Sequence, residues 1–320
     1  MEQDYFRILS QTAIADIINR DSQLITIKKS QDVEELLKKL NEYSYTSLPV
    51  TESSNSRVIG FVDTNDILTL LIKLFEKIDS SEGSQLTSGG TDDIKLLSIA
   101  FLHSSVSNIM DISKKDEFTV VLEEQNLLEV MKLYSRGLHR VALLSVFSDI
   151  REIVSQSNVI DFISRNTSLL GRLELMPIQI LFDQHVIVTR SQLIETNENL
   201  SAITSFRLMN QYRVSACAVV DDHNNITGTL SINDLAGLNE NNLDLLLKST
   251  KDFISRDNQL NKNKPSEPIV LSLNNTFKDV IMTLSQKKVH RVWIVDQSKC
   301  PISLISLTDV CKIIISPPNY

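Results

Sequence analysis

Arg291-Val-Trp-Ile-Val-Asp296, followed after a short turn by Ile302-Ser-Leu-Ile-Ser306, predicts two adjacent β-strands rich in β-branched and apolar residues. A helix with one apolar face precedes them, and its face keeps the i, i+3, i+4, i+7 spacing of an amphipathic helix: Phe277, Val280, Ile281 and Leu284. A short extended piece, Ile269–Leu273, comes before that helix, and a second helix is predicted from Leu307. The segment Pro268–Ile315 is therefore predicted to fold as strand, helix, strand, strand, helix.

The same order of elements occurs three more times earlier in the chain. The apolar helix faces of these copies are Val33, Leu36, Leu37 and Leu40; Leu127, Val130, Met131 and Tyr134; and Ala202, Ile203, Phe206 and Met209. Their strands are predicted at Leu48–Val50 and Val58–Val62, at Val141–Leu144 and Ile150–Val154, and at Cys217–Val220 and Ile226–Leu230. Because one such unit has too small a core to be stable alone, we expect the units to pair.

The four repeats divide the chain into eight segments. We assign an N-terminal segment at 1–23, repeat 1 at 24–75, a loop and linking helix at 76–117, repeat 2 at 118–166, a linker at 167–188, repeat 3 at 189–240, a linker at 241–267 and repeat 4 at 268–316. The natural division lies near residue 170, between repeats 2 and 3. Ser80–Asp93 is polar and rich in Gly and Ser, so it is predicted to be a loop. Short apolar segments predict linking helices at Ile14–Ile18, Val106–Met110 and Phe253–Ile254.

Composition argues against several classes of function. The net charge of −8 without a basic run disfavours general binding to nucleic acid or to a membrane surface, so neither is expected as a partner. No apolar run approaches the roughly 20 residues that span a membrane. The three cysteines lack CxxC spacing, which favours reduced thiols. The five histidines are scattered, and the chain has no nucleophile elbow, Walker loop or GxGxxG, so we expect no metal and no catalytic activity.

A four-residue motif follows the second strand of each repeat. The copies read Asp63-Thr-Asn-Asp66, Ser155-Gln-Ser-Asn158, Ser231-Ile-Asn-Asp234 and Ser306-Leu-Thr-Asp309. Such a motif can cap the following helix, because its hydroxyl accepts from a backbone N–H and its acid suits the helix dipole. A carboxylate in this position can also accept ribose hydroxyls. For a single copy capping is the better interpretation, whereas four copies in register favour a binding site.

This pattern resembles the CBS domain and, more closely, the gamma subunits of the AMP-activated and plant sucrose-non-fermenting-related kinases. Lys288–Asp296 (KVHRVWIVD) with Ile305–Val310 (ISLTDV) is similar to the last repeat of the plant-type subunits, and Arg213–Asp221 (RVSACAVVD) is similar to the third repeat of the animal ones. The resemblance covers nearly the whole chain and is weakest in repeat 2 after Leu143. It implies an α/β fold of α+β repeats, in which four CBS repeats pair into two modules that form a flat disc with nucleotide clefts near its centre.

The resemblance also implies which residues hold a nucleotide. The ribose position of the motif is matched by Asp66, Asp234 and Asp309, whereas Asn158 lacks the charge. His139-Arg140 and His290-Arg291 start equivalent strands and would meet the phosphates through charge-assisted bonds. Ser231, Ser306 and Thr308 would add hydroxyl contacts. Arg213 is a further basic candidate, with a solvated surface role as its alternative. Ser157 stands where animal gamma subunits have a basic residue.

The function that the resemblance implies is a non-catalytic, adenine-nucleotide-sensing gamma subunit that binds AMP, ADP or ATP. Its partners would be a Ser/Thr kinase alpha subunit and a beta scaffold subunit, in the cytoplasm, with the nucleus left open as a second location. The apolar segment Tyr5–Arg20 corresponds to the region where gamma subunits meet the beta subunit, although packing on its own disc is the alternative. Two other functions stay open: a stand-alone CBS protein that regulates another enzyme or transporter, and a scaffold that has lost ligand binding.

Overall fold

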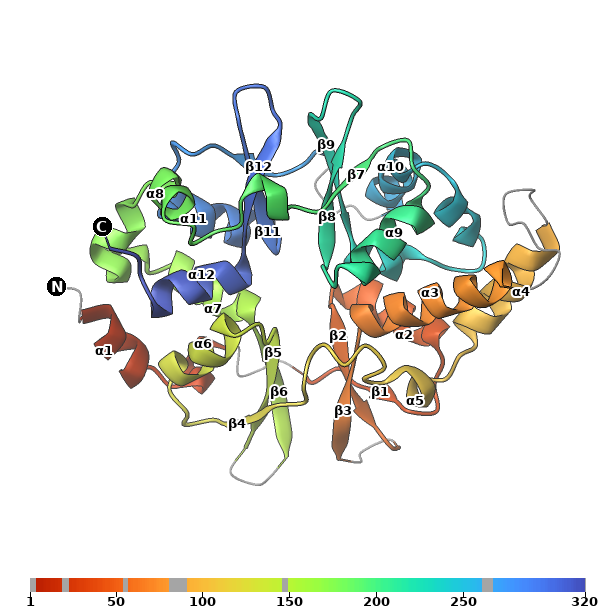
Figure 1. Ribbon diagram of the computed structural model, residues 1–320. Coiled ribbons are helices and arrows are strands. Elements are labelled where there is room, and N and C mark those ends of the chain that lie inside the picture. The colour runs from red at the N-terminus through yellow and green to blue at the C-terminus, as the bar shows by residue number, and fades with distance from the viewer. Residues whose placement is uncertain are drawn as a thin grey trace.

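The computed structural model describes residues 4–18, 23–53, 57–80, 91–145, 149–260 and 267–319 (Figure 1). Each repeat has the predicted order of strand, helix, strand, strand, helix. Repeat 1 contains β1 (Ile27–Lys28), α2 (Val33–Tyr43), β2 (Ser47–Thr51), β3 (Val58–Asp63) and α3 (Thr64–Asp79). Repeat 2 contains β4 (Val120–Leu122), α6 (Leu127–Ser135), β5 (Arg140–Leu144), β6 (Ile150–Ser155) and α7 (Gln156–Ser164).

The second half of the chain repeats this order. Repeat 3 contains β7 (Glu195–Asn197), α9 (Ala202–Gln211), β8 (Ala216–Val220), β9 (Ile226–Ser231) and the short 3-10 helix η5 (Ile232–Gly237). Repeat 4 contains β10 (Val270–Leu271), α11 (Phe277–Lys287), β11 (Arg291–Val295), β12 (Pro301–Ser306) and α12 (Leu307–Ile315). The predicted strands and helices of the four repeats are confirmed, with the difference that repeat 3 ends in a 3-10 helix.

The linking segments are mostly helical. They contain α1 (Asp4–Gln11), η1 (Ile14–Ile17), α4 (Thr91–Leu102), α5 (Val106–Ile109), η3 (Thr167–Leu175), α8 (Ile178–Asp183), η4 (Arg190–Gln192), η6 (Leu243–Leu247) and α10 (Thr250–Leu260). The predicted linking helices correspond to η1, α5 and α10. Of the predicted loop Ser80–Asp93, residues 81–90 lie outside the described part of the chain, and α4 already begins at Thr91.

All four repeats share one sheet topology. The first strand pairs parallel with the second, and the second pairs antiparallel with the third, as in β4-β5-β6. Repeat 2, where the family resemblance is weakest, therefore has the same strand pairing as the others. The third strand leads directly into the helix that carries the four-residue motif, so all four motifs lie at equivalent places in the fold.

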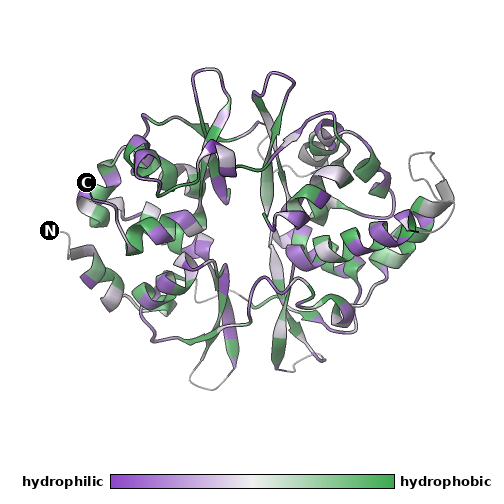
Figure 2. Cartoon of the chain, viewed as in Figure 1, coloured by the Kyte–Doolittle hydropathy of each residue, from purple (hydrophilic) through white to green (hydrophobic). Residues whose placement is uncertain are grey.

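The repeats pair through their sheets, 1 with 2 and 3 with 4, as Figure 1 shows on either side of the centre. Between repeats 3 and 4, the indole of Trp293 packs with Ala218, Val220 and Ile226. Between repeats 1 and 2, Phe61 of β3 packs edge to face against Phe118, with ring centroids 4.9 Å apart. Phe118 lies just before β4. Apolar residues predominate along these strands, whereas the tips of the β8–β9 and β11–β12 hairpins are hydrophilic (Figure 2).

The helices join the two pairs to each other through two large apolar cores. One core unites repeats 1 and 3, with Leu71 of α3 and Phe206 of α9 both fully buried. The other unites repeats 2 and 4, where Met131 of α6 and Val310 of α12 are fully buried. Each core thus combines residues from both sides of the division near residue 170, and each repeat contacts one neighbour by its sheet and another by its helices.

The N-terminal segment packs on the protein itself. Tyr5, Leu9 and Ile14 are buried in the core of repeats 2 and 4, and the Tyr5 hydroxyl donates to the Ile314 carbonyl at 3.2 Å. Residues 19 and 20 of the predicted contact segment Tyr5–Arg20 lie outside the described residues. Packing of this segment on the protein itself, the alternative to a contact with a beta subunit, therefore accounts for the apolar residues Tyr5, Leu9 and Ile14. Within the described ranges, no helix is both long and apolar enough to span a membrane.

Candidate functional site

A cavity of about 760 Å³ lies at the centre of the molecule, where the four repeats meet. Every repeat contributes to its wall, for example Asn65, Gln156, Asn233 and Thr308, each of which is in the first turn of its motif-bearing helix. Two hydrogen bonds tie these helix starts together across the centre. Thr64 donates to the side-chain oxygen of Asn233 at 3.2 Å, and Gln156 donates from its amide to the Thr308 hydroxyl at 2.8 Å.

Basic side chains outnumber acidic ones in the cavity wall, which also contains Glu152. Its cationic and imidazole side chains are Lys115, His139, Arg140, Arg213, His290 and Arg291. The N-termini of three α-helices, α3, α7 and α12, border the same space through their first residues, and helix N-termini favour anions. The arrangement therefore suits a ligand with several negative charges, in spite of the chain's overall charge of −8.

A second cavity of about 730 Å³ adjoins the first, lined mostly by repeats 3 and 4 and also by residues of repeats 1 and 2, such as Tyr45 and Ser157. Its wall includes Asp234 together with the apolar side chains of Ile254, Ile269 and Trp293. Ser231, Asn233, His290 and Arg291 border both cavities. Apolar side chains and a carboxylate thus line a space that shares basic residues with the central cavity, and we refer to this second cavity as the 3–4 cleft.

The predicted site residues are therefore divided among three places. The central cavity contains the predicted phosphate contacts and hydroxyls: His139, Arg140, Arg213, His290, Arg291, Ser231, Ser306 and Thr308. Asp234 lies in the 3–4 cleft. Asp66 and Asp309 line neither cavity.

All four motifs also act as helix caps, so the capping interpretation holds alongside any binding role. The Asp309 carboxylate accepts from the backbone N–H of Ser306 at 2.8 Å and from its hydroxyl at 2.6 Å. Asp66 is more fully occupied, because one oxygen accepts from the Asp63 N–H at 3.1 Å and the other from the Ser113 N–H at 2.9 Å. With both oxygens bonded and the side chain buried, Asp66 is not available to a ribose in this structure.

The two His-Arg pairs have different surroundings. In repeat 2, His139 Nδ1 lies 2.8 Å from an oxygen of Asp116, and Arg140 donates to Asp116 at 3.1 Å and pairs with Asp63 at 3.2 Å. In repeat 4, Arg291 donates to the uncharged hydroxyl of Ser215 at 2.7 Å. The basic charge at Arg140 is therefore balanced by two carboxylates, whereas Arg291 contacts a neutral side chain.

The electrostatic state of repeat 4 follows from its burial. Burial, together with the neighbouring charge of Arg291, lowers the pKa of His290 to about 4, so its imidazole is neutral at pH 7. Its Nδ1 can then accept from the Asn233 amide, which lies 3.5 Å away. Burial lowers the pKa of Arg291 to about 10, and Asp309 acts in the opposite sense, so Arg291 stays charged. A phosphate beside this pair would meet one full positive charge and one imidazole able to take up a proton.

Sequence reasoning missed several residues of the central cavity. Lys115 lines it and donates to the Asn65 side-chain oxygen at 3.0 Å. Asp116 and Asp63 neutralise Arg140, although neither was predicted to act there. One signal was present in the sequence, since repeat 1 has Asp63 where the other motifs have Ser. The Lys114-Lys115-Asp116 run before repeat 2 has no counterpart in the motif pattern, and only the folded chain brings it to the centre.

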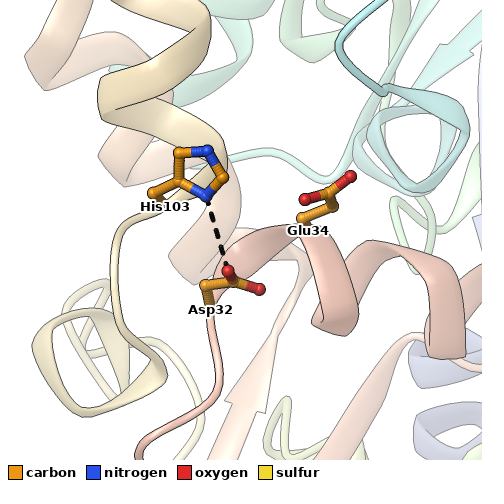
Figure 3. Close-up of side chains that lie close together, drawn as sticks. All are labelled: Asp32, Glu34 and His103. Atoms are coloured by element: carbon orange, nitrogen blue, oxygen red, sulfur yellow. Dashed lines mark ion pairs between the residues drawn. The ribbon is translucent and has the colours of Figure 1, made fainter.

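One cluster outside the cavities has residue types that can bind metals (Figure 3). Asp32, Glu34 and His103 each place one ligand atom within 4.8 Å of the others. Asp32 already caps α2 by accepting from the Glu35 N–H at 3.1 Å, and its other oxygen lies 3.5 Å from His103 Nδ1. Glu34 and His103 are exposed. Helix capping and a surface ion pair account for this cluster.

A repeated strand, helix, strand, strand, helix unit, paired through its sheets and with helix starts around a central cavity, is the architecture of CBS domains. The CBS domain family matches residues 14–73, 187–239 and 264–316, just over half of the sequence. The chain belongs to the CBS-domain family. Repeat 2 is not among the matched segments, and its membership rests on the topology that it shares with the other three repeats.

The chain is also similar to individual proteins. It is 28% identical over 299 residues to the protein SDS23 of Candida glabrata, covering 88% of this chain and 52% of that protein. The chain thus spans about half the length of the curated relatives it matches. Protein MJ1225 of Methanocaldococcus jannaschii, proposed as an archaeal homologue of γ-AMPK, has the same fold with a TM-score of 0.70 and 14% identity, over 94% of this chain and 99% of that one. A conserved protein of Pyrococcus horikoshii matches with a TM-score of 0.53 and 14% identity, over 95% and 100%.

Proposed function

We propose that this chain is a non-catalytic regulatory protein that binds an adenine nucleotide across the 3–4 cleft and the central cavity. The observation that carries the proposal is that Ser231, Asn233, His290 and Arg291 border both spaces. A nucleotide whose base lies among Ile254, Ile269 and Trp293 would place its ribose near Asp234. Its phosphates would then extend past Arg291 into the basic centre.

The chemistry of the cavity supports binding rather than catalysis. Its wall offers hydrogen-bond donors and positive charge, and the three cysteines of the chain all lie outside it. Cys217 and Cys311 are buried, and burial raises the pKa of each thiol to about 12, which makes them poor nucleophiles. A protein of this kind acts through a partner, because its ligand can shift only an equilibrium between two states of a complex.

Calorimetry tests this proposal directly. AMP, ADP, ATP and GTP are titrated into the purified chain, and thermal unfolding is followed with the same ligands. We expect heat and stabilisation with at least one adenine nucleotide, and a ligand at 100 times its dissociation constant should stabilise by about 2.7 kcal/mol. Absence of both signals with every adenine nucleotide up to millimolar concentration rejects the proposal and leaves the scaffold alternative.

The regulated partner is proposed from resemblance. Repeats 3 and 4 resemble those of kinase gamma subunits, which supports a Ser/Thr kinase alpha subunit and a beta scaffold as partners in the cytoplasm or nucleus. The stand-alone alternative is favoured by one specific observation, because the SDS23 proteins to which the chain is similar are not named as kinase subunits. Affinity purification from gently lysed native cells separates the two, since a heterotrimer would yield kinase and beta chains in near-equal amounts with the tagged protein.

A further inference from the structure

The linker between α5 and repeat 2, residues 111–117, is hydrogen-bonded to the start of α3. Its Ser113 N–H donates to Asp66, and its Lys115 ammonium donates to the side chain of Asn65. The equivalent carboxylate in repeat 3, Asp234, lines the 3–4 cleft instead. The linker thus covers in repeat 1 the carboxylate whose counterpart is part of a cavity wall in repeat 3.

Asp116, at the end of this linker, is held by the side chains of His139 and Arg140. Only 3% of its side chain is exposed, and both carboxylate oxygens lie within 2.9 Å of His139 Nδ1. One of the two also accepts from Arg140 Nη2 at 3.1 Å. Two oxygens held by a histidine and an arginine reproduce the contacts that two phosphate oxygens would make with the same pair.

Arg140 retains one donor that no residue satisfies. Its side chain is only 6% exposed, and Nη1 is buried without a hydrogen-bond partner among the described residues. A buried, unsatisfied guanidinium donor is costly, and it is typical of a position where a ligand or water completes the contacts. Since Arg140 lines the central cavity, an anion that replaced Asp116 could complete the contacts of this donor.

We propose that Asp116, tethered by the linker, competes with phosphate for the anion position at His139-Arg140. By occupying this position, Asp116 restricts phosphate binding in the central cavity to His290-Arg291. This inference rests on the proposed function for the identity of the natural ligand. The asymmetry of the two His-Arg pairs carries it, because Arg140 contacts two carboxylates and Arg291 contacts the neutral Ser215.

A tethered carboxylate competes strongly for two physical reasons. Its local concentration is set by the linker and not by the solution, and short tethers give effective concentrations in the millimolar range. Burial raises the pKa of Asp116, but the hydrogen bond from His139 and the charge of Arg140 outweigh it, so the pKa lies below its ordinary value. Asp116 therefore stays ionised at neutral pH and balances the positive charge that would attract a phosphate.

Inorganic pyrophosphate is the probe for this site, because it has phosphate oxygens and no base or ribose. The variant Asp116→Asn removes the competing charge and keeps the side-chain shape. We expect it to bind pyrophosphate about ten- to a hundredfold more tightly than the wild type in calorimetry, since one charge-assisted contact is freed. The double variant Asp116→Asn/Arg140→Gln should lose that gain. An affinity of Asp116→Asn equal to that of the wild type overturns the inference.

Asp111→Asn is the matched control. Asp111 is in the same linker, 46% of its side chain is exposed, and it pairs with Lys114 on the surface. The substitution changes the net charge by the same amount without touching the cavity, so its pyrophosphate affinity should equal that of the wild type. A gain of the same size in Asp111→Asn would assign the effect to general charge and reject a specific role for Asp116.

Hydrogen exchange on the wild type provides a second measurement that does not need the variant to fold. If linker and anion exclude each other, saturating pyrophosphate raises the protection of the Ser113 N–H by no more than that of core amides far from the cavity, which reports the general stabilisation by a bound ligand. A larger increase at Ser113 than at those amides would mean that linker and anion bind together and would overturn the inference. The proposed function can fail independently of this inference. The wild type could show no binding of any adenine nucleotide while Asp116→Asn still binds pyrophosphate more tightly than the wild type does.

Discussion

The indole N–H of Trp293 donates a hydrogen bond to the hydroxyl oxygen of Thr229, with an Nε1–Oγ1 distance of 2.8 Å. This bond joins β11 of repeat 4 to β9 of repeat 3, across the sheet-to-sheet contact. Trp293 is 1% exposed and is the only tryptophan in the chain. Its fluorescence therefore reports on this one contact between repeats, which also forms part of the 3–4 cleft.

Thr229→Val should lower the free energy of unfolding by about 1–3 kcal/mol, because it leaves the buried indole N–H without its acceptor. Urea unfolding followed by tryptophan fluorescence measures the change. The control is Thr227→Val on the same strand, whose side chain is exposed and should change stability by no more than about 0.5 kcal/mol. Equal losses in the two variants would mean that the Trp293 contact contributes nothing of its own.

The aspartates of the motif should differ in their effect on nucleotide binding. Asp234→Ala is expected to weaken adenine-nucleotide binding about ten- to a hundredfold, because a charge-assisted contact in the 3–4 cleft is lost. Asp66→Ala should not weaken binding and should lower stability, since both oxygens of Asp66 bond to backbone N–H groups. Calorimetry and thermal unfolding on both variants separate these effects. Equal loss of affinity in the two variants would contradict the assignment.

His290 should make the protein less stable as the pH falls. Its pKa in the folded protein, about 4, lies below its ordinary value of 6.5, so the unfolded chain takes up the proton first. The stability that neutral His290 contributes is thus complete above pH 6.5 and is lost as the pH falls toward 4. The loss should reach about 2 kcal/mol between pH 7 and pH 5.

Unfolding curves of the wild type and of His290→Gln across this range provide the measurement. The difference between the two isolates His290 from other groups, among them Asp66, whose burial, together with the charge of Asp63, raises its pKa to about 6 and acts in the opposite direction. A constant difference at all pH values would show that His290 keeps an ordinary pKa in the folded protein.

The N-terminal helix should behave as part of the core. Leu9→Ala is expected to cost about 2–5 kcal/mol of stability, because Leu9 is 3% exposed within the core of repeats 2 and 4. Ser10→Ala, on the exposed side of the same helix, is the control. Thermal unfolding of the isolated protein provides the comparison. A silent Leu9→Ala variant would instead favour use of this segment by a partner chain.

Much of the fold could be predicted because each repeat combines two short-range signals. The i, i+3, i+4 spacing of Phe277, Val280 and Ile281 indicates a helix face, and the β-rich run from Arg291 indicates a strand. Repetition of this pattern compensates for the weak copy in repeat 2. The packing of repeat 1 against repeat 3, and of repeat 2 against repeat 4, had no such signal, because it depends on helix surfaces that meet only in the folded chain.

The candidate site was predictable only in part, for a related reason. His290 and Arg291 stand out in the sequence because an equivalent His-Arg pair recurs in repeat 2. Asp116 occurs once, outside every repeat, and its role depends on a contact with residues more than twenty positions away. A search for repeated motifs cannot identify a residue that occurs only once. Here such a residue, Asp116, helps to balance the charge of Arg140 at the central cavity.

The exchange of core partners between the two halves of the chain has a consequence for biosynthesis. Repeats 1 and 2 leave the ribosome first, but the apolar cores around Leu71 and Met131 are completed only by repeats 3 and 4. The nascent chain therefore exposes part of each apolar surface until repeat 3 has covered the first and repeat 4 the second, a state that favours aggregation or chaperone binding. A fragment that ends between the two halves would keep those surfaces exposed. Premature termination there is therefore expected to yield an aggregation-prone chain and not an independently folded half.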